Sequence, residues 1–337
     1  MKKLLPILFV LIITSCSKEV PLEQTVVRNG ITYEVNSKEP FTGTTVSYHE
    51  NGQLEQRSTL KDGKEDGFQE LYFENGQLTE EGNWKDGKLD GLSEWYYENG
   101  QLRFKRNYKD GKLDGLREWY YENGQLKEKG NYKDGKEDGL HEVYHKNGQL
   151  KEKGNYKDGK EDGLREWYYD NGQLQMRFNF KDGKEDGLWE SYHDNGKLKS
   201  KSNYKDGELN GLYEVYSDNG QLEYRRNYKD GKKNGLVETF YEDGSFKSKE
   251  NYKDGKKNGL SETFHIDSTL ETIENYKDGK LDGFYMWNTV MGNGERKEGF
   301  YKDGKLDGLS KWVTNGRTWS PVCWDKGIKV SMSKCQN

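Results

Sequence analysis

The tripeptide Lys-Asp-Gly returns at a fixed interval, and this period constrains the fold more than any other feature of the chain. Its glycine stands every 24 residues from Gly63 to Gly279, and the tripeptide occurs once more at Gly304. A fixed period of this size is typical of stacked structural repeats, in which each unit packs mainly on its neighbours. The sequence therefore predicts one continuous array of about 11–12 repeats.

A second turn signal falls between these tripeptides. Asn-Gly recurs with the same spacing and becomes Asp-Gly once; the glycines are Gly52, Gly76, Gly100, Gly124, Gly148, Gly172, Gly196, Gly220 and, after Asp, Gly244. The runs between the turns are short, rich in Tyr, Trp and Leu, and without helical period, as expected of strands. The sequence predicts an all-β fold: an elongated single antiparallel meander of repeated β-hairpins, one hairpin per 24 residues.

The Asn-Gly pair predicts a two-residue loop in a type I′ turn, which fixes the strand register. For Asn123-Gly124 this loop places Tyr121 opposite Leu126. Applied along the chain, the rule brings opposite charges together in seven consecutive hairpins: Glu94 with Lys105, Glu118 with Lys129, Glu142 with Lys153, Glu166 with Arg177, Glu190 with Lys201, Glu214 with Arg225 and Glu238 with Lys249. A wrong register would scramble these pairs, so they support it. The outer repeats depart from the rule; Glu70 falls opposite Glu81, and Glu262 opposite Ile273.

The same register sorts the side chains onto two faces of the sheet. Arg117 and Trp119 share one face with Tyr132, which lies across from Gly115, and we expect this face to be the packed one. The other face carries residues such as Leu116. The longer segment Lys-Asp-Gly-Lys-x-Asp/Asn-Gly is expected to join one hairpin to the next.

The first residues have the form of a leader for export. MKKLLPILFVLIITSC contains two lysines, an apolar run from Leu4 to Ile13 and small residues before Cys16, and is too short for a permanent membrane span. The run from Ile13 to Cys16 resembles the lipobox of bacterial lipoproteins, which implies cleavage before Cys16 and a lipid on that residue. The alternative is an ordinary signal peptide with an incidental cysteine. Because Ser17 rather than Asp follows, the resemblance implies an outer-membrane or cell-surface location in the cell envelope.

Two further cysteines, Cys323 and Cys335, stand near the C-terminus. In an exported chain such a pair predicts a disulfide, with two free thiols as the alternative. We expect this segment to cap the open edge of the array. The predicted divisions are a signal peptide at 1–15, a lipidated linker at 16–24, the repeat array at 25–320 and a C-terminal cap at 321–337.

The repeat unit itself resembles a known family. Tyr-x-x-Asn-Gly-Gln-Leu, followed by Asn-Tyr-Lys-Asp-Gly-Lys-x-Asp-Gly-Leu, is similar to the bacterial variant of the MORN repeat, and the run from Lys38 to Gly43 looks like its first unit. The resemblance covers residues 25–320 and implies a ribbon of β-hairpins that serves as a binding or scaffolding module. Many bacterial members carry the label of a YwqK-type antitoxin, which implies a toxin partner.

The composition and the motifs argue against catalysis and nucleic-acid binding. The net charge is −5 and no basic face is apparent, so nucleic acid is not an expected partner. The histidines His49, His141, His145, His193 and His265 form no Ser/His/Asp or metal-ligand arrangement and are expected to be surface residues. The Asp and Gly spacing of the longer turn is similar to a calcium loop, but a lysine at its third position, as in Lys112, would repel the ion. We expect no metal, no cofactor and no enzymatic activity.

Aromatic residues are abundant, with 24 Tyr, 12 Phe and 9 Trp. In three repeats Trp is followed two residues later by Tyr, and these are the candidate binding residues: Trp95, Tyr97, Trp119, Tyr121, Trp167 and Tyr169. Such a stripe can hold sugar rings or a protein partner. Other repeats have Val143, Ser191, Val215, Thr239 and Thr263 at the Trp position, which favours packing over a repeated ligand site.

These features predict a membrane-anchored lipoprotein, facing the periplasm or the cell surface, whose array is a non-catalytic scaffold for an unidentified protein partner. Two alternatives stay open. One is binding of a cell-wall glycan through the aromatic stripe, and the other is an antitoxin or immunity role.

Overall fold

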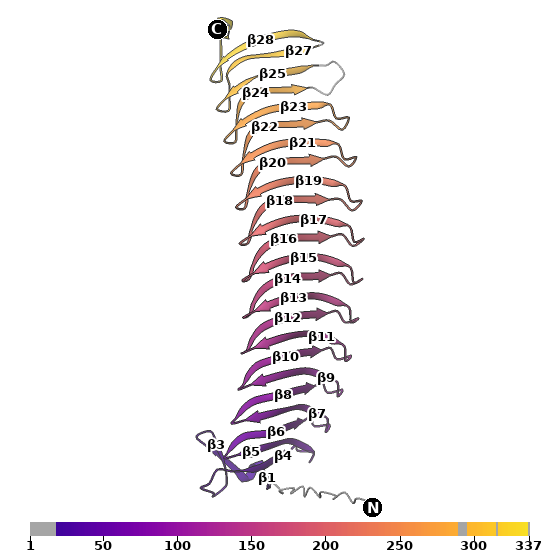
Figure 1. The fold of residues 1–337 in the computed structure, drawn as a ribbon, viewed down its shortest axis with the longest axis vertical. Coiled ribbons are helices and arrows are strands. Elements are labelled where there is room, and N and C mark those ends of the chain that lie inside the picture. Colours follow the sequence, from indigo (N-terminus) through magenta and orange to yellow (C-terminus); the bar gives the residue numbers. More distant parts are fainter. Residues whose placement is uncertain (1–17, 289–294, 315, 336–337) are drawn as a thin grey trace, which may run out of the picture. The chain divides into compact units, whose positions relative to one another are not determined.

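The computed structural model describes residues 18–288, 295–314 and 316–335. They fall into two compact units, Met1–Gly148 and Gln149–Asn337. The described residues contain no α-helix, and accordingly none that is long and apolar enough to cross a membrane. Each unit is built around an open antiparallel meander (Figure 1), which confirms the predicted all-β hairpin fold.

In the first unit, β4 to β12 pair in chain order, β1 adds in parallel beside β4, and β2 and β3 form a separate hairpin. The elements are β1 (Glu19–Pro21), the 3₁₀ helix η1 (Leu22–Gln24), β2 (Thr25–Arg28), β3 (Ile31–Glu34), β4 (Gly43–Tyr48), β5 (Leu54–Lys61), β6 (Lys64–Tyr72), β7 (Leu78–Lys85), β8 (Lys88–Tyr96), β9 (Leu102–Lys109), β10 (Lys112–Tyr120), β11 (Leu126–Lys133) and β12 (Lys136–Tyr144). Strand β1 thus lies within the segment that the sequence assigns to a linker.

The second unit contains a meander of the same kind, which begins at β13 and is followed by a short 3₁₀ helix. The elements are β13 (Leu150–Lys157), β14 (Lys160–Tyr168), β15 (Leu174–Lys181), β16 (Lys184–Tyr192), β17 (Leu198–Lys205), β18 (Glu208–Tyr216), β19 (Leu222–Lys229), β20 (Lys232–Phe240), β21 (Phe246–Lys253), β22 (Lys256–Phe264), β23 (Leu270–Lys277), β24 (Lys280–Asn288), β25 (Arg296–Lys302), β26 (Lys305–Leu306), β27 (Gly308–Thr314), β28 (Arg317–Asp325), β29 (Ile328–Val330) and η2 (Met332–Cys335).

The two turn signals form different turns from those expected. Asp110 and Gly111 have φ values of 49° and 79°, and the flanking lysines pair, so Lys-Asp-Gly-Lys is the two-residue type I′ hairpin. At the other turn the amide of Gly124 donates to the carbonyl of Tyr121 (2.9 Å), and the amide of Tyr121 donates to the carbonyl of Gln125 (2.8 Å). Only Gly124 in this loop has positive φ (81°). Asn-Gly therefore belongs to a three-residue loop, a type I turn closed by a glycine bulge, and the predicted type I′ turn there is wrong.

The longer loop does not disturb the register further along the hairpin. Tyr120, not Tyr121, lies opposite Leu126, so that part of the predicted pairing is wrong. The extra residue Lys127 is absorbed as a bulge, and beyond it Glu118 faces Lys129 as predicted. The same shift follows the other Asn-Gly loops, for example in β14–β15 and β18–β19.

A second irregularity bends each strand that follows a type I′ turn. The register of β10 against β9 shifts between Leu113 and Arg117, and Gly115 within this stretch has φ of 110°. A Cβ on Gly115 would stand 3.2 Å from the Cβ of Asn107, whose Nδ2 donates to the carbonyl of Leu116 (2.9 Å). Glycine is required here both by its backbone angle and by the close approach of Asn107. The strands curve at these bulges (Figure 1).

The acidic residue before this glycine supports the turn of the following repeat. The Oδ2 of Asp114 accepts a hydrogen bond from the backbone amide of Asp134 (3.4 Å). The same contact joins Asp162 to Asp182 and Asp186 to Asp206, each at 3.3–3.4 Å. The spacing that is similar to a calcium loop therefore serves a backbone contact between repeats.

Few apolar side chains are fully buried. Val20, Phe41 and Leu60 form a small cluster at the first strands of the array. In the second unit, Cys323 on β28 is bonded to Cys335 in η2, with an S–S distance of 1.99 Å and a Cα–Cα distance of 5.8 Å. Elsewhere in each unit, the sheet is held by its backbone ladder and by side chains that lie along its two faces.

Candidate functional site

The predicted tryptophans lie on the face that carries Arg117, which we call the inner face. In the first unit, Trp95 on β8 is opposite Phe104 on β9, and Phe104 is opposite Trp119 on β10. The ring centroids are 6.4 Å apart for Trp95 and Phe104, and 5.3 Å apart for Phe104 and Trp119. Phe104 thus links two candidate residues. The sequence analysis missed it, although the register alone places it between them.

In the second unit, Trp167 occupies the equivalent position on β14. Its ring centroid is 4.7 Å from that of Phe178, which in turn lies 6.3 Å from that of Trp189. Trp167 therefore belongs to a separate aromatic group within its own unit.

Each of these tryptophans carries a cation of its own chain over its ring. The guanidinium of Arg106 is 4.9 Å from the Trp95 centroid, and the ammonium of Lys127 is 3.1 Å from the Trp119 centroid. In the second unit, the Arg165 guanidinium lies 4.5 Å from the Trp167 centroid. Stacking of a sugar ring requires a free aromatic face, so this arrangement favours packing within the sheet.

The candidate tyrosines lie at the start of the Asn-Gly loops and do not join the tryptophan rows. The hydroxyl of Tyr97 donates to the carbonyl of Tyr120 (2.8 Å), and that of Tyr121 donates to the carbonyl of Tyr144 (2.9 Å). Tyr169 makes the same bond to Tyr192 (2.8 Å) in the second unit. Each ring thus connects its loop to the backbone of the next repeat. We call this set of positions the ring ladder; it comprises His49, Phe73, Tyr97, Tyr121, His145, Tyr169, His193, Ser217, Tyr241 and His265.

Four of the five histidines belong to the ring ladder, a relationship that the sequence analysis missed. The Nε2 of His49 lies 2.8 Å from the carbonyl oxygen of Tyr72, and the Nε2 of His193 lies 3.0 Å from that of Tyr216. A carbonyl only accepts, so Nε2 carries the proton in both contacts. Imidazole here replaces phenol as a ring with a hydrogen-bond donor at its far end. Comparing residues 24 apart would have found it.

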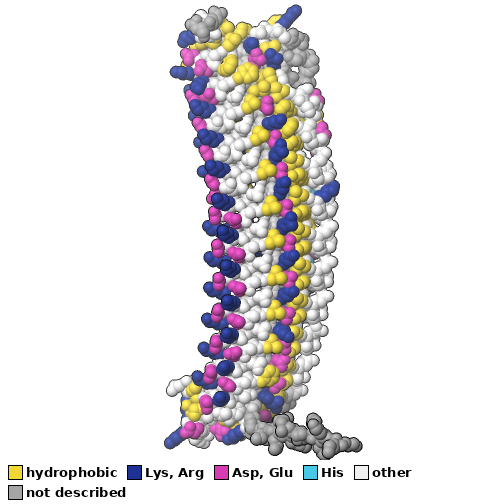
Figure 2. Space-filling model, viewed as in Figure 1, with side chains coloured by type: hydrophobic (Ala, Val, Ile, Leu, Met, Phe, Trp, Pro, Cys, Tyr) yellow, Lys and Arg dark blue, Asp and Glu magenta, His cyan; other side chains and the backbone are white. Residues whose placement is uncertain are grey.

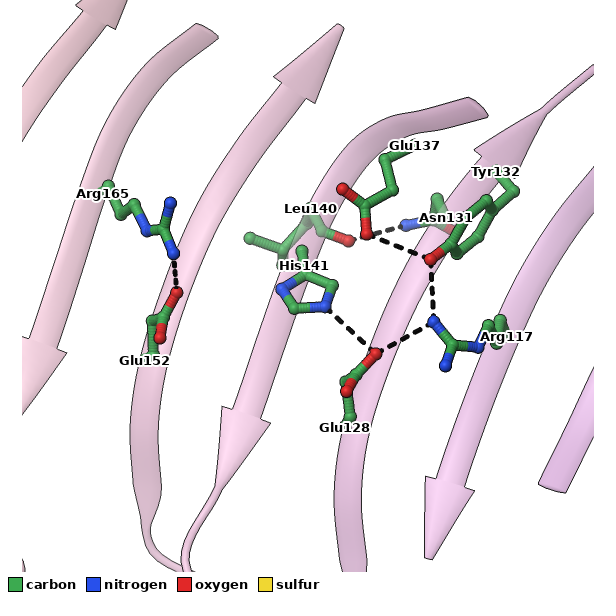
Figure 3. Close-up of polar contacts among 9 residues, drawn as sticks. All are labelled: Arg117, Glu128, Asn131, Tyr132, Glu137, Leu140, His141, Glu152 and Arg165. Carbon is green, nitrogen blue, oxygen red and sulfur yellow. Dashed lines mark hydrogen bonds and ion pairs between the residues drawn. The ribbon is translucent and has the colours of Figure 1, made fainter. Parts of the chain in front are cut away.

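The remaining histidine belongs to a polar network on the inner face (Figure 3). His141 Nε2 lies 3.4 Å from Glu128 Oε1, and Arg117 Nη1 lies 3.0 Å from the same oxygen. Arg117 also donates to the hydroxyl of Tyr132 (2.8 Å), which donates to Glu137 (3.0 Å). The hydrogen bond from His141 holds the pKa of Glu128 below its usual range against the opposing effect of burial. In the second unit Arg165 pairs with Glu152, also drawn in Figure 3.

This network contains a His–Glu pair, but the side chains in contact in Figure 3 include no serine, threonine or cysteine that could act as a nucleophile. Among the residues that the structure describes, no group of three or more His, Cys, Asp and Glu side chains is arranged to hold a metal ion. The charged groups of the network around Glu128 instead pair with one another, next to Trp119 at the end of the aromatic row.

The opposite face, which we call the outer face, carries a ladder of alternating charges. Lys129 lies opposite both Glu118 and Glu142, and its ammonium is 2.5 Å from Glu142 in the next hairpin. In the second unit the contact from Lys153 to Glu166 is 2.6 Å and that from Lys201 to Glu214 is 2.8 Å. The predicted pairing of charged residues, such as Glu118 with Lys129, is confirmed. Most of these cations nevertheless approach the glutamate of the following hairpin rather than that of their own.

The ladder is interrupted once in the first unit. Glu81 on β7 lies opposite both Glu70 and Glu94, where the other repeats alternate in charge. The hydroxyl of Tyr96 lies 2.7 Å from Glu81 Oε1 and 3.1 Å from Glu94 Oε2. Burial and these two carboxylates raise the pKa of Tyr96. Three carboxylates in adjacent strands form a local defect in the electrostatic pattern.

Beside the charge ladder runs a row of exposed apolar residues, one in most repeats, which we call the leucine row. Its members are 37–42% exposed: Phe68, Leu116 and Leu140 in the first unit, and Leu164, Leu188, Leu236 and Leu260 in the second. Figure 2 shows hydrophobic side chains in stripes on either side of a column of alternating basic and acidic groups. The leucine row was not among the candidate residues. Its position in every repeat, next to Asp/Asn-Gly, is visible in the sequence.

The fold and its two patterned faces define an antiparallel β-hairpin repeat protein. Nine segments match the model of the MORN repeat variant: 41–62, 65–86, 89–110, 113–134, 137–158, 161–182, 185–206, 209–230 and 233–254. The chain belongs to this family. Repeats of this family generally serve as non-catalytic scaffolds for protein interactions.

Comparisons beyond the family add little. No curated protein matches the chain. Among solved structures, similarity is found to a TcdB2–TccC3 complex with Cdc42 (12% identity, TM-score 0.18, covering 87% of this chain and 19% of that one). The TcdB2–TccC3 complex has 13% identity and a TM-score of 0.18, and the match covers 89% of this chain and 17% of that one. The Tc holotoxin pore of Photorhabdus luminescens has 13% identity and a TM-score of 0.17, with coverage of 87% and 19%. The chain spans less than a fifth of these proteins, and at such TM-scores the likeness carries no argument.

Proposed function

We propose that this chain is a lipid-anchored, non-catalytic scaffold that binds a protein partner through its leucine row. The row itself is the observation that carries the proposal. Leu116 and Leu140 in the first unit are 38% and 39% exposed and occupy the same repeat position. Exposed apolar surface that is bordered by polar groups is typical of a protein interaction site.

The charge ladder supports this role because it borders the row on one side. Its carboxylates and cations already pair with one another, as in Lys129 and Glu142 at 2.5 Å. A partner can therefore bury the leucines without leaving an unpaired charge at the edge of the interface. Apolar anchors next to satisfied polar groups are the usual composition of a protein interface.

Repetition provides a second argument. Two strands per repeat, about 4.8 Å apart, place successive leucines on the order of 10 Å apart. A partner with its own regular surface can engage several of them at once. The first contact then raises the effective concentration of the others, so the overall affinity exceeds that of a single weak contact. A scaffold of this kind gains affinity from the number of repeats it engages.

The anchor is proposed from the leader sequence, since Cys16 lies outside the described residues. Strand β1 begins at Glu19, three residues after Cys16 in the sequence. Three residues span at most about 10 Å. A lipid on Cys16 would therefore hold the first strands of the array close to the bilayer, at the outer membrane or cell surface.

The binding surface is tested by replacing Leu116, Leu140 and Leu188 together with lysine, and in a matched control with methionine. Proteins crosslinked to each form in the native envelope are compared by quantitative mass spectrometry. The proposal predicts at least one protein that is retained by the methionine variant and reduced more than about tenfold, or 1.4 kcal/mol, by the lysine variant. Equal recovery with both variants would contradict it.

The anchor is tested separately by metabolic labelling with a fatty acid. Wild type should incorporate the label and sediment with membranes, and Cys16→Ala should do neither. Equal labelling of the two forms would remove the anchor from the account without affecting the leucine row.

A further inference from the structure

The ring ladder has one position without a ring, and that position lies beside a hollow. In the second unit, the rings of Tyr169, His193 and Tyr241 each reach the backbone of the next repeat, with contacts of 2.8, 3.0 and 2.8 Å. Between His193 and Tyr241, the ladder position is held by Ser217. The short side chain of Ser217 thus replaces a long one, whose hydrogen-bond donor lies at the far end of a ring.

The hydroxyl of Ser217 is used within its own loop. It donates to Asn219 Oδ1 (2.6 Å) or the carbonyl of Gln221 (3.1 Å), and accepts from the amide of Gln221 (3.2 Å). By the spacing of its neighbours in the ladder, its counterpart would be the carbonyl of Phe240, 23 residues ahead. The serine does not supply that bond.

The surface is hollowed beside Ser217. A hollow of about 770 Å³ is lined by His193, Ser217, Leu222, Tyr224, Phe240 and Tyr241, among others. Successive ladder positions are on the order of 10 Å apart, so the rings on either side of Ser217 are separated by about twice that distance. That distance leaves room for one aromatic ring, which would lie on the order of 10 Å from the ladder ring on each side.

We propose that this hollow, the Ser217 slot, binds a phenol ring, either free or as the tyrosine side chain of a partner segment. The ring takes the place that Tyr169 and Tyr241 occupy in their own repeats, and its hydroxyl donates to the Phe240 carbonyl. The lining combines Leu222 and Phe240 with charged groups such as Glu242 and Lys247. A phenol suits this mixture, because its ring packs on the apolar side chains while its hydroxyl donates to the backbone. This site is additional to the scaffold role and is independent of the leucine row.

The slot is open to solvent, so binding of a small phenol is expected to be weak. A ligand of eight heavy atoms with few contacts reaches a Kd on the order of 1 mM. A tyrosine within a partner segment would add contacts beyond the ring and bind more tightly.

The test uses 4-fluorophenol as the probe and fluorine NMR as the readout, since the many aromatic residues of the protein do not interfere. The full mature chain should broaden the probe signal with saturable binding at one site. Ser217→Tyr, which restores the residue found in other repeats, should weaken binding more than tenfold. Ser217→Ala leaves the slot open and should bind as the wild type does.

A variant with a second slot keeps the proposal falsifiable if Ser217→Tyr folds poorly. Tyr169→Ser should create an equivalent hollow in another repeat and raise the stoichiometry from one to two. Displacement of the probe by N-acetyl-tyrosinamide assigns the slot to tyrosine side chains, and failure to displace restricts it to free phenols. The proposal is overturned if the wild type does not bind at 10 mM probe, a concentration about ten times the expected Kd, or if Ser217→Tyr binds as well as wild type.

Discussion

The hydroxyl of Tyr121 donates a hydrogen bond to the carbonyl oxygen of Tyr144, 2.9 Å away and 23 residues further along the chain. Tyr97 makes the same contact with Tyr120 at 2.8 Å. Each bond joins an Asn-Gly loop to the end of the first strand of the next hairpin, β10 or β12. Since neighbouring repeats share no conventional core, such contacts contribute to the coupling between them.

Removal of one such hydroxyl should weaken the array locally. Tyr121→Phe is expected to lower stability by about 0.5–1.5 kcal/mol, because one hydrogen bond is lost while the ring stays. Phe73 at the same ladder position shows that the ring alone fits. Hydrogen exchange of β10 to β12 should rise, since the loss is confined to this part of the first unit. Unchanged exchange would mean that the bond does not couple the repeats.

A reversal of charge at Glu81 should stabilise the protein. Lysine at this position would alternate with Glu70 and Glu94, as Lys129 does with its neighbours, and we expect a gain of about 0.5–1 kcal/mol at low salt. The change removes the hydrogen bond from Tyr96 to Glu81 (2.7 Å) but leaves Glu94 (3.1 Å) as an acceptor for the same hydroxyl. The midpoint of urea unfolding provides the measurement.

The control for this change is Glu81→Gln, which removes the repulsion without adding attraction. It should give a smaller gain, and the advantage of lysine over glutamine should shrink in about 1 M salt, where charges are screened within roughly 3 Å. A lysine variant that is less stable than wild type at low salt would contradict the charge ladder as a stabilising pattern.

Stability should fall at alkaline pH. Burial, together with Glu118, raises the pKa of Tyr120 to about 12, and the hydrogen bond to Glu142 raises the pKa of Lys129. Both groups hold their protons more tightly in the folded than in the unfolded chain. The folded state therefore binds more protons above about pH 10, and stability decreases as pH rises through about 12.

This effect is measured by urea unfolding together with tyrosinate absorbance. Native protein at about pH 11 should retain protonated tyrosines that ionise on unfolding, because an exposed tyrosine titrates near pH 10. Ionisation of all tyrosines of the native protein near pH 10, with constant stability, would contradict the prediction that burial raises the pKa of Tyr120.

The aromatic row should matter for stability rather than for glycan binding. Trp119→Ala removes the contact with Phe104 at 5.3 Å and the partner of Lys127, and should cost about 1–3 kcal/mol. Trp119→Phe should cost less. Wild type should not bind peptidoglycan in a pull-down. The glycan alternative would be supported instead if wild type bound peptidoglycan and Trp119→Ala lost this binding without losing stability.

Much of the fold follows from the sequence because the period repeats each signal many times. The register of Glu118 and Lys129 could be predicted even though the turn was assigned incorrectly. A two-residue loop and a three-residue loop with a bulge at Lys127 lead to the same pairing beyond the bulge. Which of the two Gly-containing turns takes two positive φ angles was not apparent from residue type, because both Asp-Gly and Asn-Gly favour them.

The site was harder to predict, because side-chain contacts depend on details that the repeat pattern does not contain. The ion pair of Lys129 with Glu142 rather than with Glu118 depends on side-chain conformations, because the lysine lies opposite both glutamates. The position of Phe104 between two tryptophans follows from the register, and the ring ladder follows from the period. The leucine row was overlooked because a leucine in a strand is ordinarily assigned to a core.

The central claim, that the outer face binds a protein partner, is tested most directly with a photo-crosslinking amino acid placed at one of two positions. Leu116 belongs to the leucine row, and Arg103 is an exposed residue whose guanidinium lies 5.1 Å from the Phe104 ring centroid beside the inner aromatic row. Irradiation of the native envelope should yield a discrete protein adduct from position 116 and none from position 103. Adducts from position 103 alone, or from neither position, would contradict the account.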